Sequence, residues 1–496
     1  MYDEIRWLVQ ELRSLAGALS AGPEGPLLLA IDQGGHASRA IVVDARGAIR
    51  AESFSPISTF RIGHDRVEHD ASEIVASIRA ALDELAETLG NDCARVVAAG
   101  LATQRSSVVC WDRRSGKALS PVLSWQDRRN AMLIERLRDR ASMIRKQTGL
   151  VLSPHYGASK LRWCLDQADA VVAARREDRL ALGPLSSYLL YTLLDERPYV
   201  VDPANASRTQ LWAPRTRMWS AELAALFDVP IDLLPHCVGT RHTFGHLDLA
   251  GRAVPLVVCT GDQSAAPFAF GPIDPATVYL NMGTGAFLQR VGERDDPRLL
   301  RSVLYSDAHG LITVQEGTVN GAAGALDWLH ARVDIDVYRV AQTLRRSQRA
   351  ADVPLFLNGV GGVGSPYWCD QLAPRFVGEG DEAAQVQAVL ESIAFLICRN
   401  LERMADPPLR RVLATGGLSV SDYLCECIAA LSGVPVERAP SREATALGLA
   451  FLVADQPNDW YVPADVERFM PQSDAALASR YTQWCRLMEA YCGSRL

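Results

Sequence analysis

The chain has 496 residues, of which 48% are hydrophobic, and its formal net charge is −7. This length exceeds that of one ordinary domain and suffices for two large hydrophobic cores. The lack of a basic stripe excludes the usual nucleic-acid-binding pattern, and no apolar run is long enough to span a bilayer. The eleven cysteines include no CxxC pair, which favours reduced, buried thiols over metal ligands. We therefore expect a cytoplasmic protein without a membrane or nucleic-acid partner.

Residues 1–20 carry apolar side chains at helical spacing, interrupted by charged residues. A secretory signal would have a basic start and an uninterrupted apolar run, so the pattern predicts an additional amphipathic helix. We assign residues 1–25 to this helical extension, because glycine and proline residues between positions 22 and 26 separate it from the first predicted strand.

The next two elements form a predicted hairpin. Apolar runs at residues 27–31 and 40–43 indicate buried strands, and the turn between them contains Gly34 and Gly35. In Walker and Rossmann motifs the glycine loop instead opens a helix. Backbone amides in a glycine turn can approach phosphate oxygens closely. The hairpin is therefore a candidate phosphate site, although most glycine turns are only turns.

A helix and another strand come after the hairpin. Residues 70–73, Asp-Ala-Ser-Glu, resemble a capping box with Asp70 at the N-cap. Apolar residues then recur at helical spacing until Gly90, which ends the predicted helix. Residues 96–101 indicate a further buried strand.

The second half repeats the hairpin pattern. An apolar run at residues 254–258 leads to Asp262, and residues 278–288 again indicate strand, glycine turn, strand. Each half thus contains one glycine-tipped hairpin, which hints at duplication. We place the boundary near residue 250 and predict lobes at 26–250 and 251–496.

Three positions carry candidate chemistry. Asp262 ends a predicted buried strand, where a carboxylate is costly unless it is paired or functional, and it could accept a proton from an alcohol. Asp32 could orient Mg²⁺ through water, or it could merely form the turn. A Gly416-Gly417 step would let an adenine ring lie flat on the backbone, with an ordinary strand-to-helix turn as the alternative.

The chain resembles the FGGY carbohydrate kinases, and among them the glycerol kinases. The similarity runs from about residue 27 to residue 453, and the matching motifs occur in the family's order. They lie at residues 30–34, 67–70, 104–105, 124–126, 148–151, 160–163, 205–209, 261–263, 283–285, 316–317, 364–368, 390–394 and 444–448.

The resemblance implies an α/β fold of two actin-like (ribonuclease H-like, ASKHA) lobes around a central cleft. It also implies that ATP, with Mg²⁺, phosphorylates a hydroxyl of a small polyol or sugar. By position, Asp262 matches the catalytic base and Asp32 the acidic residue near Mg²⁺. Relatives often form dimers or tetramers, which leaves a homo-oligomer open.

The resemblance also assigns binding residues. Arg105 and Gln263 match polyol contacts, and Trp125 and Phe287 match apolar walls beside the substrate, although core packing would otherwise be the default interpretation of these two. Ser106 and His155 occupy further substrate positions. The expected nucleotide and phosphate contacts are Gly34, Gly35, His36, Thr284, Gly324, Asp327, Gly417 and Ser421.

Several positions depart from the glycerol kinase pattern. Residues 35–39 read Gly-His-Ala-Ser-Arg where Thr-Thr-Ser-Ser-Arg is usual. Of the hydroxyl groups that are lost, we expect two to be donors toward phosphate. Each such hydrogen bond is worth about 1 kcal/mol, so phosphate binding should weaken without being lost. His36 either supplies a replacement donor or faces solvent. Asp327 and Ser421 stand where Gln and Asn are common, which leaves the preferred nucleotide base open.

The substrate positions differ more. Ser106 stands where glycerol kinases have Glu, and His155 stands where they have Tyr. Losing a carboxylate that bonds a substrate hydroxyl changes specificity strongly and leaves room. We therefore expect glycerol to be a poor substrate and a larger polyol or ketose to be a better one.

Two other classes of function compete with the kinase. One is a catalytically weakened relative that acts as a metabolite- or nucleotide-binding sensor, motivated by the altered hairpin and substrate positions. The other is a different hydrolase or transferase on the same fold. Pure binding would not require the retained set of Asp32, Arg105, Asp262, Gln263 and Thr284.

Overall fold

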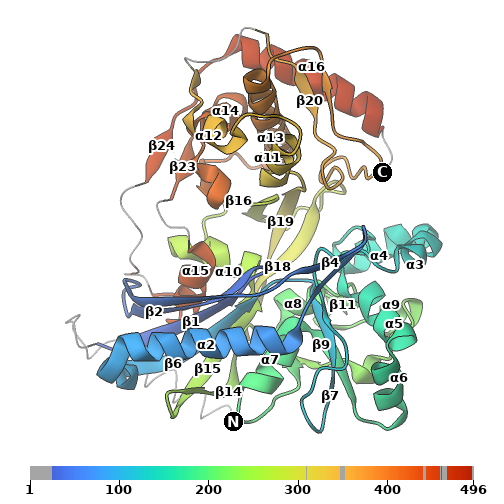
Figure 1. Cartoon of the computed structure of the whole chain (residues 1–496), viewed down its shortest axis with the longest axis vertical. Coiled ribbons are helices and arrows are strands. Elements are labelled where there is room, and N and C mark those ends of the chain that lie inside the picture. The colour runs from blue at the N-terminus through green and yellow to red at the C-terminus, as the bar shows by residue number, and fades with distance from the viewer. Residues whose placement is uncertain are drawn as a thin grey trace. The chain divides into compact units, whose positions relative to one another are not determined.

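The computed structural model describes residues 25–308, 310–346, 352–439, 443–457, 460 and 466–493. The predicted helical extension at 1–25 therefore lies, except for Gly25, outside the described residues. The chain forms two compact units (Figure 1). Unit 1 comprises Met1–Ile273, Ser302–Ile312 and Glu443–Val462, and unit 2 comprises Asp274–Arg301, Thr313–Arg442 and Pro463–Leu496.

This division differs from the predicted boundary near residue 250. Strand β15 (Arg252–Gly261) pairs in parallel with β6 (Val96–Thr103), so it extends the sheet of unit 1. Asp262, which comes directly after β15, belongs to unit 1 rather than to the second lobe, and unit 1 continues to Ile273. Sequence patterns locate strands but not their sheet partners, which explains the error.

The main sheet of unit 1 has the strand order β14-β15-β6-β1-β2-β3. Strand β1 pairs antiparallel with β2 and parallel with β6, which confirms the predicted glycine-tipped hairpin. The remaining bounds are β1 Leu27–Gln33, β2 Ala37–Asp44, β3 Ile49–Pro56 and β14 Arg241–Leu249.

A second sheet in unit 1 has the order β4-β5-β8-β7-β9, and two short two-stranded ladders accompany it. It shares apolar cores with the helices around it. Its strands are β4 Phe60–Ile62, β5 Arg66–His69, β8 Val122–Leu123, β7 Val108–Asp112 and β9 Leu180–Pro184, and the ladders pair β10 Val200–Val201 with β13 His236–Cys237 and β11 Trp212–Ala213 with β12 Met218–Trp219.

Helix α2 (Ala71–Leu89) lies along the β1–β3 region of the main sheet (Figure 1). Asp70 caps it by accepting bonds from the backbone N–H groups of Ser72 and Glu73, and Gly90 ends it with φ 54°, as predicted. The other helices of unit 1 are α3 Ala131–Arg136, α4 Ala141–Thr148, α5 Gly157–Gln167, α6 Asp169–Arg176, α7 Leu185–Leu193, α8 Pro203–Ser207, α9 Ala221–Leu226, α10 Asp262–Ala265 and α15 Ala444–Val453.

Helix α15 packs unusually closely in unit 1, against β6 and the segment after Asp262. A Cβ on Gly448 would lie 2.0 Å from the carbonyl oxygen of Ala265, and a Cβ on Gly100 would lie 2.6 Å from Val453. Only glycine permits these approaches. The helix thereby supports the strand ends that carry the candidate site.

The second large sheet, most of whose residues belong to unit 2, has the order β18-β19-β17-β16-β22-β23-β24. Its section β19-β17-β16-β22-β23 repeats the order and directions of β3-β2-β1-β6-β15, with two antiparallel pairs followed by two parallel ones. This repetition confirms the duplicated, actin-like fold. The strands are β16 Thr277–Met282, β17 Ala286–Val291, β18 Leu300–Ser306, β19 Leu311–Val319, β22 Arg411–Thr415, β23 Val436–Arg438 and β24 Glu467–Phe469.

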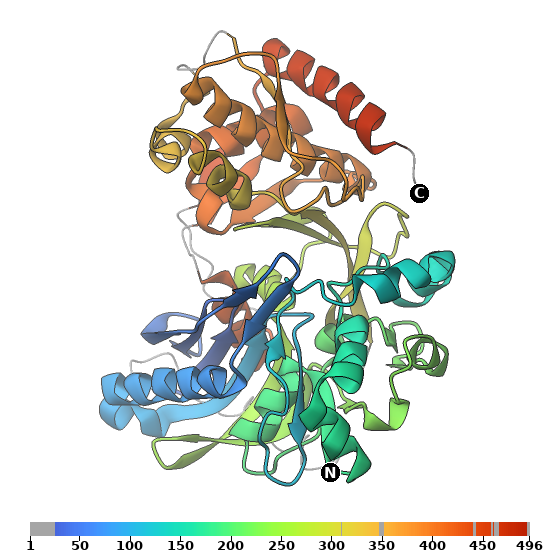
Figure 2. The ribbon, with the colours of Figure 1, turned by 45° about the vertical axis from the view of Figure 1, so that its right-hand side comes forward.

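Helices and a small hairpin complete unit 2. Figure 2 shows α16, in red, along the outer edge of this group of helices, where Trp484 packs against Phe395 of α13. None of the helices in the described part of the chain is both long and apolar enough to cross a membrane. The elements are α11 Ala323–His330, α12 Val337–Thr343, α13 Glu382–Met404, α14 Asp422–Ser432, α16 Ala475–Cys492, and the hairpin of β20 Leu355–Leu357 with β21 Arg375–Val377.

Candidate active site

Three neighbouring parallel strands of unit 1 end at the same edge of the sheet. In the register, Asp32 of β1 lies opposite Ala102 of β6, and Gly261 of β15 lies opposite Thr103. The carboxyl ends of parallel strands are where α/β folds place their ligand sites. Asp32, Arg105 and Asp262, which were predicted from separate motifs, are thereby brought together.

Asp262 contacts an arginine. Its Oδ1 lies 3.9 Å from Nε of Arg105 and accepts a 2.7 Å hydrogen bond from the backbone N–H of Gln263. The Arg105 side chain is 7% exposed and that of Asp262 is 23% exposed, so Asp262 stays reachable. Burial raises the pKa of Asp262, and the Arg105 charge opposes this rise. A carboxylate with raised proton affinity is suited to accept a proton.

Asp32 lies near Asp262 in an electrostatically unfavourable environment. Burial, reinforced by the Asp262 charge, raises the pKa of Asp32 to about 7, while Arg39 lowers it. Its buried Oδ1 has no hydrogen-bond partner among the described residues. A buried carboxylate oxygen of this kind fits a cation.

The wider surroundings of Asp32 limit what metal could bind there. The described residues contain no group of three or more His, Cys, Asp or Glu side chains arranged to hold a metal ion. Mg²⁺ binds through one or two carboxylates together with water and phosphate oxygens, so Asp32 fits this ion better than a metal that needs a protein cage. Arg39, which forms an ion pair with Glu443, was not among the predicted site residues.

The tip of the β1–β2 hairpin is held by buried glutamines. Nε2 of Gln104 donates to the carbonyl of Gly34 at 3.2 Å and to Oε1 of Gln33 at 3.3 Å. These supports were also missed, although both glutamines lie inside the family motifs. At the tip itself, His36 is exposed, and a Cβ on Gly35 would lie 3.7 Å from Nε1 of Trp125. The predicted phosphate turn and the predicted apolar wall are therefore neighbours.

The altered substrate positions lie in two loops of unit 1. Ser106 directly follows Arg105 and adopts a left-handed φ of 66°, which is uncommon for a residue other than glycine. His155 is half-buried, and its Nδ1 lies 3.0 Å from Oγ of Ser153. Burial, followed by the nearby charges of Lys160 and Arg128, lowers the pKa of His155 to about 3. This imidazole is therefore neutral at physiological pH.

The glycine turns of unit 2 also converge. The carbonyl of Thr284, at the tip of the β16–β17 hairpin, accepts hydrogen bonds from the backbone N–H groups of Ala322 (3.0 Å) and Gly324 (3.1 Å). Gly416, with φ 87°, lies so close to β16 that a Cβ on it would be 2.5 Å from the Met282 carbonyl oxygen. Thr284, Gly324 and Gly417 thus lie around one edge of this sheet.

Three further predicted residues of unit 2 differ in accessibility. Asp327 is exposed on α11 and accepts a hydrogen bond from the hydroxyl of Tyr338. Phe287 is half-buried on β17. Ser421 is buried, and its Oγ donates to the Ala341 carbonyl and accepts from Leu424 N at the start of α14. The hydroxyl of Ser421 is therefore already engaged as a helix cap.

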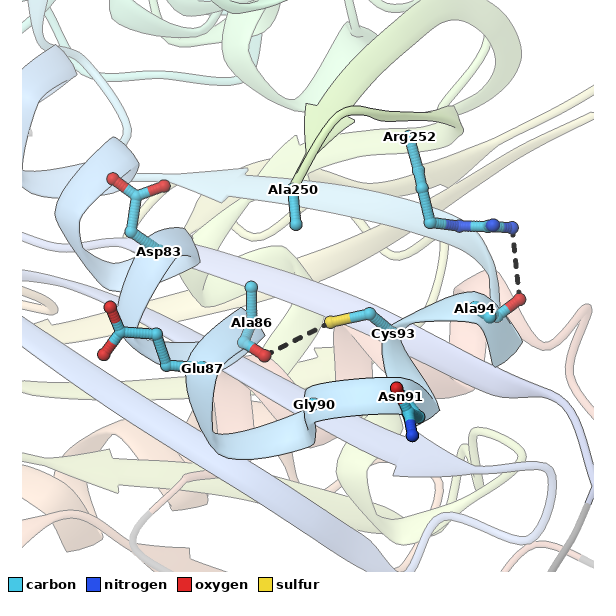
Figure 3. A pocket seen from close by; sticks show the side chains of 9 residues that line it. All are labelled: Asp83, Ala86, Glu87, Gly90, Asn91, Cys93, Ala94, Ala250 and Arg252. Carbon is cyan, nitrogen blue, oxygen red and sulfur yellow. Dashed lines mark hydrogen bonds between the residues drawn. The ribbon is translucent and has the colours of Figure 1, made fainter.

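A surface hollow of 610 Å³ lies elsewhere in unit 1, between α2 and the β14–β15 turn (Figure 3). None of the predicted site residues lines it. Arg252 and Cys93 donate hydrogen bonds to the carbonyls of Ala94 and Ala86, and burial raises the pKa of the Cys93 thiol. The hollow adjoins the start of β15, whereas Asp262 lies just beyond the end of that strand. We therefore place the candidate site at Asp262.

A histidine with so low a pKa should make stability depend on pH. The unfolded chain binds a proton at His155 below about pH 6.5, whereas the folded protein does so only near pH 3, so acidification favours unfolding. When the pH is lowered from about 7.5 to about 5, the unfolding free energy of both proteins should fall. We expect the fall to be about 1–2 kcal/mol smaller in His155→Gln than in the wild type. Urea unfolding at both pH values measures this. His64→Gln, at an exposed site, is the control; equal losses in wild type and His155→Gln would contradict the prediction.

The duplicated sheets define an actin-like fold, and the carboxylate–arginine pair at a strand edge marks a candidate active site in it. Residues 27–269 match the N-terminal domain, and residues 278–454 the C-terminal domain, of the FGGY family of carbohydrate kinases. The chain belongs to this family, and it is a phosphotransferase with an alcohol acceptor. These matches confirm the resemblance, the fold and the class of enzyme, and they do not favour the sensor alternative.

Individual relatives agree with this assignment. A glycerol kinase of Cereibacter sphaeroides is 32% identical and spans 93% of this chain and 99% of its own length. A glycerol kinase of a Geobacter species is 33% identical over 86% of this chain and 89% of its own. Among solved structures, Plasmodium falciparum glycerol kinase with ADP has a TM-score of 0.82 at 20% identity, covering 95% of this chain and 99% of its own. Xylulose kinase from Rhodospirillum rubrum has a TM-score of 0.78 at 22% identity, with coverages of 94% and 98%.

Proposed function

We propose that this kinase transfers the γ-phosphoryl group of ATP to a hydroxyl of a polyol or ketose larger than glycerol. The observation that carries the proposal is the short Ser106 side chain, next to the Arg105–Asp262 pair, at the position where glycerol kinases carry a carboxylate. His155, whose imidazole is neutral, stands where glycerol kinases have tyrosine, and this changes a second substrate position. Both changes remove bonds suited to glycerol, and a site that has lost such bonds discriminates against that substrate.

Asp262 is proposed as the base. The acceptor hydroxyl gives its proton to the Asp262 carboxylate while its oxygen bonds to the γ-phosphorus; the bond from that phosphorus to the β–γ bridging oxygen breaks, and ADP leaves with the electron pair. Arg105 favours the ionised form of Asp262 before the reaction and can donate to a neighbouring substrate hydroxyl. Gln263, whose backbone already bonds Asp262, is proposed to hold another hydroxyl.

Asp32 is proposed to hold Mg²⁺, which supplies positive charge to the phosphates when bound. This role is supported by the Oδ1 atom of Asp32, for which the described part of the chain offers no hydrogen-bond partner. Thr284, Gly324 and Gly417 are proposed as nucleotide contacts in unit 2, and Gly34 and Gly35 as phosphate contacts in unit 1. The β1–β2 hairpin lacks hydroxyl side chains at residues 35–37, so its contacts would be backbone amides.

The substrate proposal is tested by a panel of polyols and ketoses of increasing length, glycerol included, each incubated with Mg-ATP while ADP release is followed. We expect at least one longer acceptor to have a higher kcat/KM than glycerol. Asp262→Asn serves as the blank for acceptor-independent ADP release. Glycerol outperforming every longer acceptor would overturn the specificity proposal and leave the family assignment intact.

Gly261 offers a test of the Arg105 contact. A Cβ on Gly261 would lie 2.4 Å from Cγ of Arg105, so Gly261→Ala must displace that side chain. The backbone of Gly261 is extended (φ −84°, ψ 149°), so alanine adds no backbone strain. We expect KM for the acceptor to rise about tenfold because a small displacement of a positioning group is costly. Steady-state kinetics measures this, with Gly292→Ala, at an uncrowded position, as control; an unchanged acceptor KM would argue against Arg105 as a substrate contact.

A further inference from the structure

Lys160, on helix α5, is fully buried in unit 1 and was not among the predicted site residues. Its ammonium nitrogen donates hydrogen bonds to three backbone carbonyls. These belong to Ser106 at 3.1 Å, Ser124 at 2.7 Å and His155 at 2.7 Å. An ammonium group has three N–H donors, so these carbonyls use its full capacity.

The three carbonyls lie in the three segments that form the acceptor side of the candidate site. Ser106 directly follows Arg105, Ser124 directly precedes Trp125, and His155 is itself a candidate. These segments are far apart in sequence, and the bonds of Lys160 place their carbonyl oxygens around a single nitrogen atom. The bond to Ser106 also holds a residue in a left-handed conformation, which needs support from its surroundings.

Stability alone is a poor explanation for this lysine. Burial lowers the pKa of Lys160 to about 7, which shows how unfavourable the environment is for a charge. The neighbouring carboxylate of Asp127 is bonded to Arg129 and to the backbone N–H of Val67. A well-packed apolar side chain is often at least as stabilising as a buried charge. The position of Lys160 is better explained by the geometry that it imposes.

We infer that Lys160 is a positioning residue that sets the relative placement of Arg105, Trp125 and His155 for the acceptor. The inference rests on the proposed acceptor site, but it does not depend on which acceptor is preferred. Removing the ammonium should release three loops at once and misplace the acceptor contacts. The nucleotide contacts proposed in unit 2 do not involve these loops, and in unit 1 only the phosphate turn at Gly35 neighbours Trp125. The KM for ATP should therefore change much less than the KM for the acceptor.

The test compares Lys160→Met with the wild type, using whichever panel member, glycerol included, has the highest kcat/KM. We expect the acceptor KM to rise at least about tenfold, while the KM for ATP stays within about twofold. Lys160→Gln, which keeps two N–H donors without the charge, should show a smaller rise in acceptor KM. Leu165→Ala is the matched control because Leu165 is a buried apolar residue of the same helix; its melting temperature should fall while its acceptor KM stays at the wild-type value.

Hydrogen exchange followed by mass spectrometry tests the same inference without turnover. In Lys160→Met, and to a smaller degree in Lys160→Gln, peptides that contain residues 105–107, 124–126 and 154–156 should exchange faster, whereas Leu165→Ala should not affect these three together. The inference is overturned if both Lys160 variants behave like Leu165→Ala in KM and exchange, or if the two KM values rise equally. Should Lys160→Met fail to fold, Lys160→Gln decides by the same criteria. If the longer-acceptor proposal is wrong, only the ranking of the acceptor panel shows it. If the inference about Lys160 is wrong, the KM values and the hydrogen exchange of the Lys160 variants show it.

Discussion

Replacing Asp262 with asparagine is expected to lower kcat by about a thousandfold, because general-base catalysis contributes about 10²–10⁴ in rate. Asparagine keeps the shape of the side chain and can still accept the bond from Gln263 N, but it cannot take a proton at neutral pH. The KM for ATP should change little, since the lost interaction belongs to proton transfer. Steady-state kinetics with the best acceptor measures both quantities.

A matched variant separates this effect from a general loss of a carboxylate. Asp248 is exposed on β14 of the same unit, and Asp248→Asn should retain wild-type kcat. The melting temperature of Asp262→Asn should not fall, because burial already disfavours the charged form of this carboxylate. A reduction of kcat smaller than about tenfold in Asp262→Asn would show that another group accepts the proton.

Introducing glutamate at position 106 is expected to raise kcat/KM for glycerol by about 10–100-fold and to lower it for the longer acceptor. A site that bonds a substrate hydroxyl discriminates strongly against molecules that do not complete the bond. The introduced carboxylate would lie next to Arg105. It would fill the part of the acceptor site that the shorter Ser106 side chain leaves open. Because Ser106 already adopts a left-handed φ of 66°, glutamate should meet a similar backbone cost. The measurement is the ratio of the two kcat/KM values.

Ser106→Gln is the control for this exchange of specificity. Glutamine has nearly the size of glutamate but lacks the charge. Ser106→Gln should therefore exclude the longer acceptor, but it should raise kcat/KM for glycerol less than Ser106→Glu does. If Ser106→Glu leaves both kcat/KM values unchanged, residue 106 does not contribute to acceptor selection. If both acceptors lose activity equally, the side chain has disturbed the loop rather than the pocket.

Much of the local structure can be predicted from sequence patterns. The capped helix from Ala71 to Leu89, the strands β1, β6 and β15, and both glycine-tipped hairpins lie where periodicity and turn residues predict them. Asp32, Arg105 and Asp262 were nominated from motifs, and the parallel register of three strands brings them to one edge. These features depend on residue types within a short stretch of chain, which is why they can be predicted.

Other features carry no such local signal. No sequence pattern indicates that β15 joins the main sheet of unit 1. The prediction that Asp262 belongs to the second lobe is therefore wrong, because Asp262 lies in unit 1. Ser421 is predicted to contact the nucleotide, and no sequence pattern indicates that its hydroxyl caps α14 and bonds Ala341. Lys160 lies inside a family motif, but its role depends on backbone carbonyls, which every residue possesses.

The sequence by itself therefore determined the family, the kinds of strands and turns, and the candidate carboxylates Asp32 and Asp262, because these depend on side-chain chemistry and short-range periodicity. Only the tertiary structure decided which strand ends meet, how burial raises the pKa of Asp32 and Asp262, and that one buried ammonium ties three loops together. Those properties arise from long-range pairing and exclusion of water, which depend on groups distant in the chain.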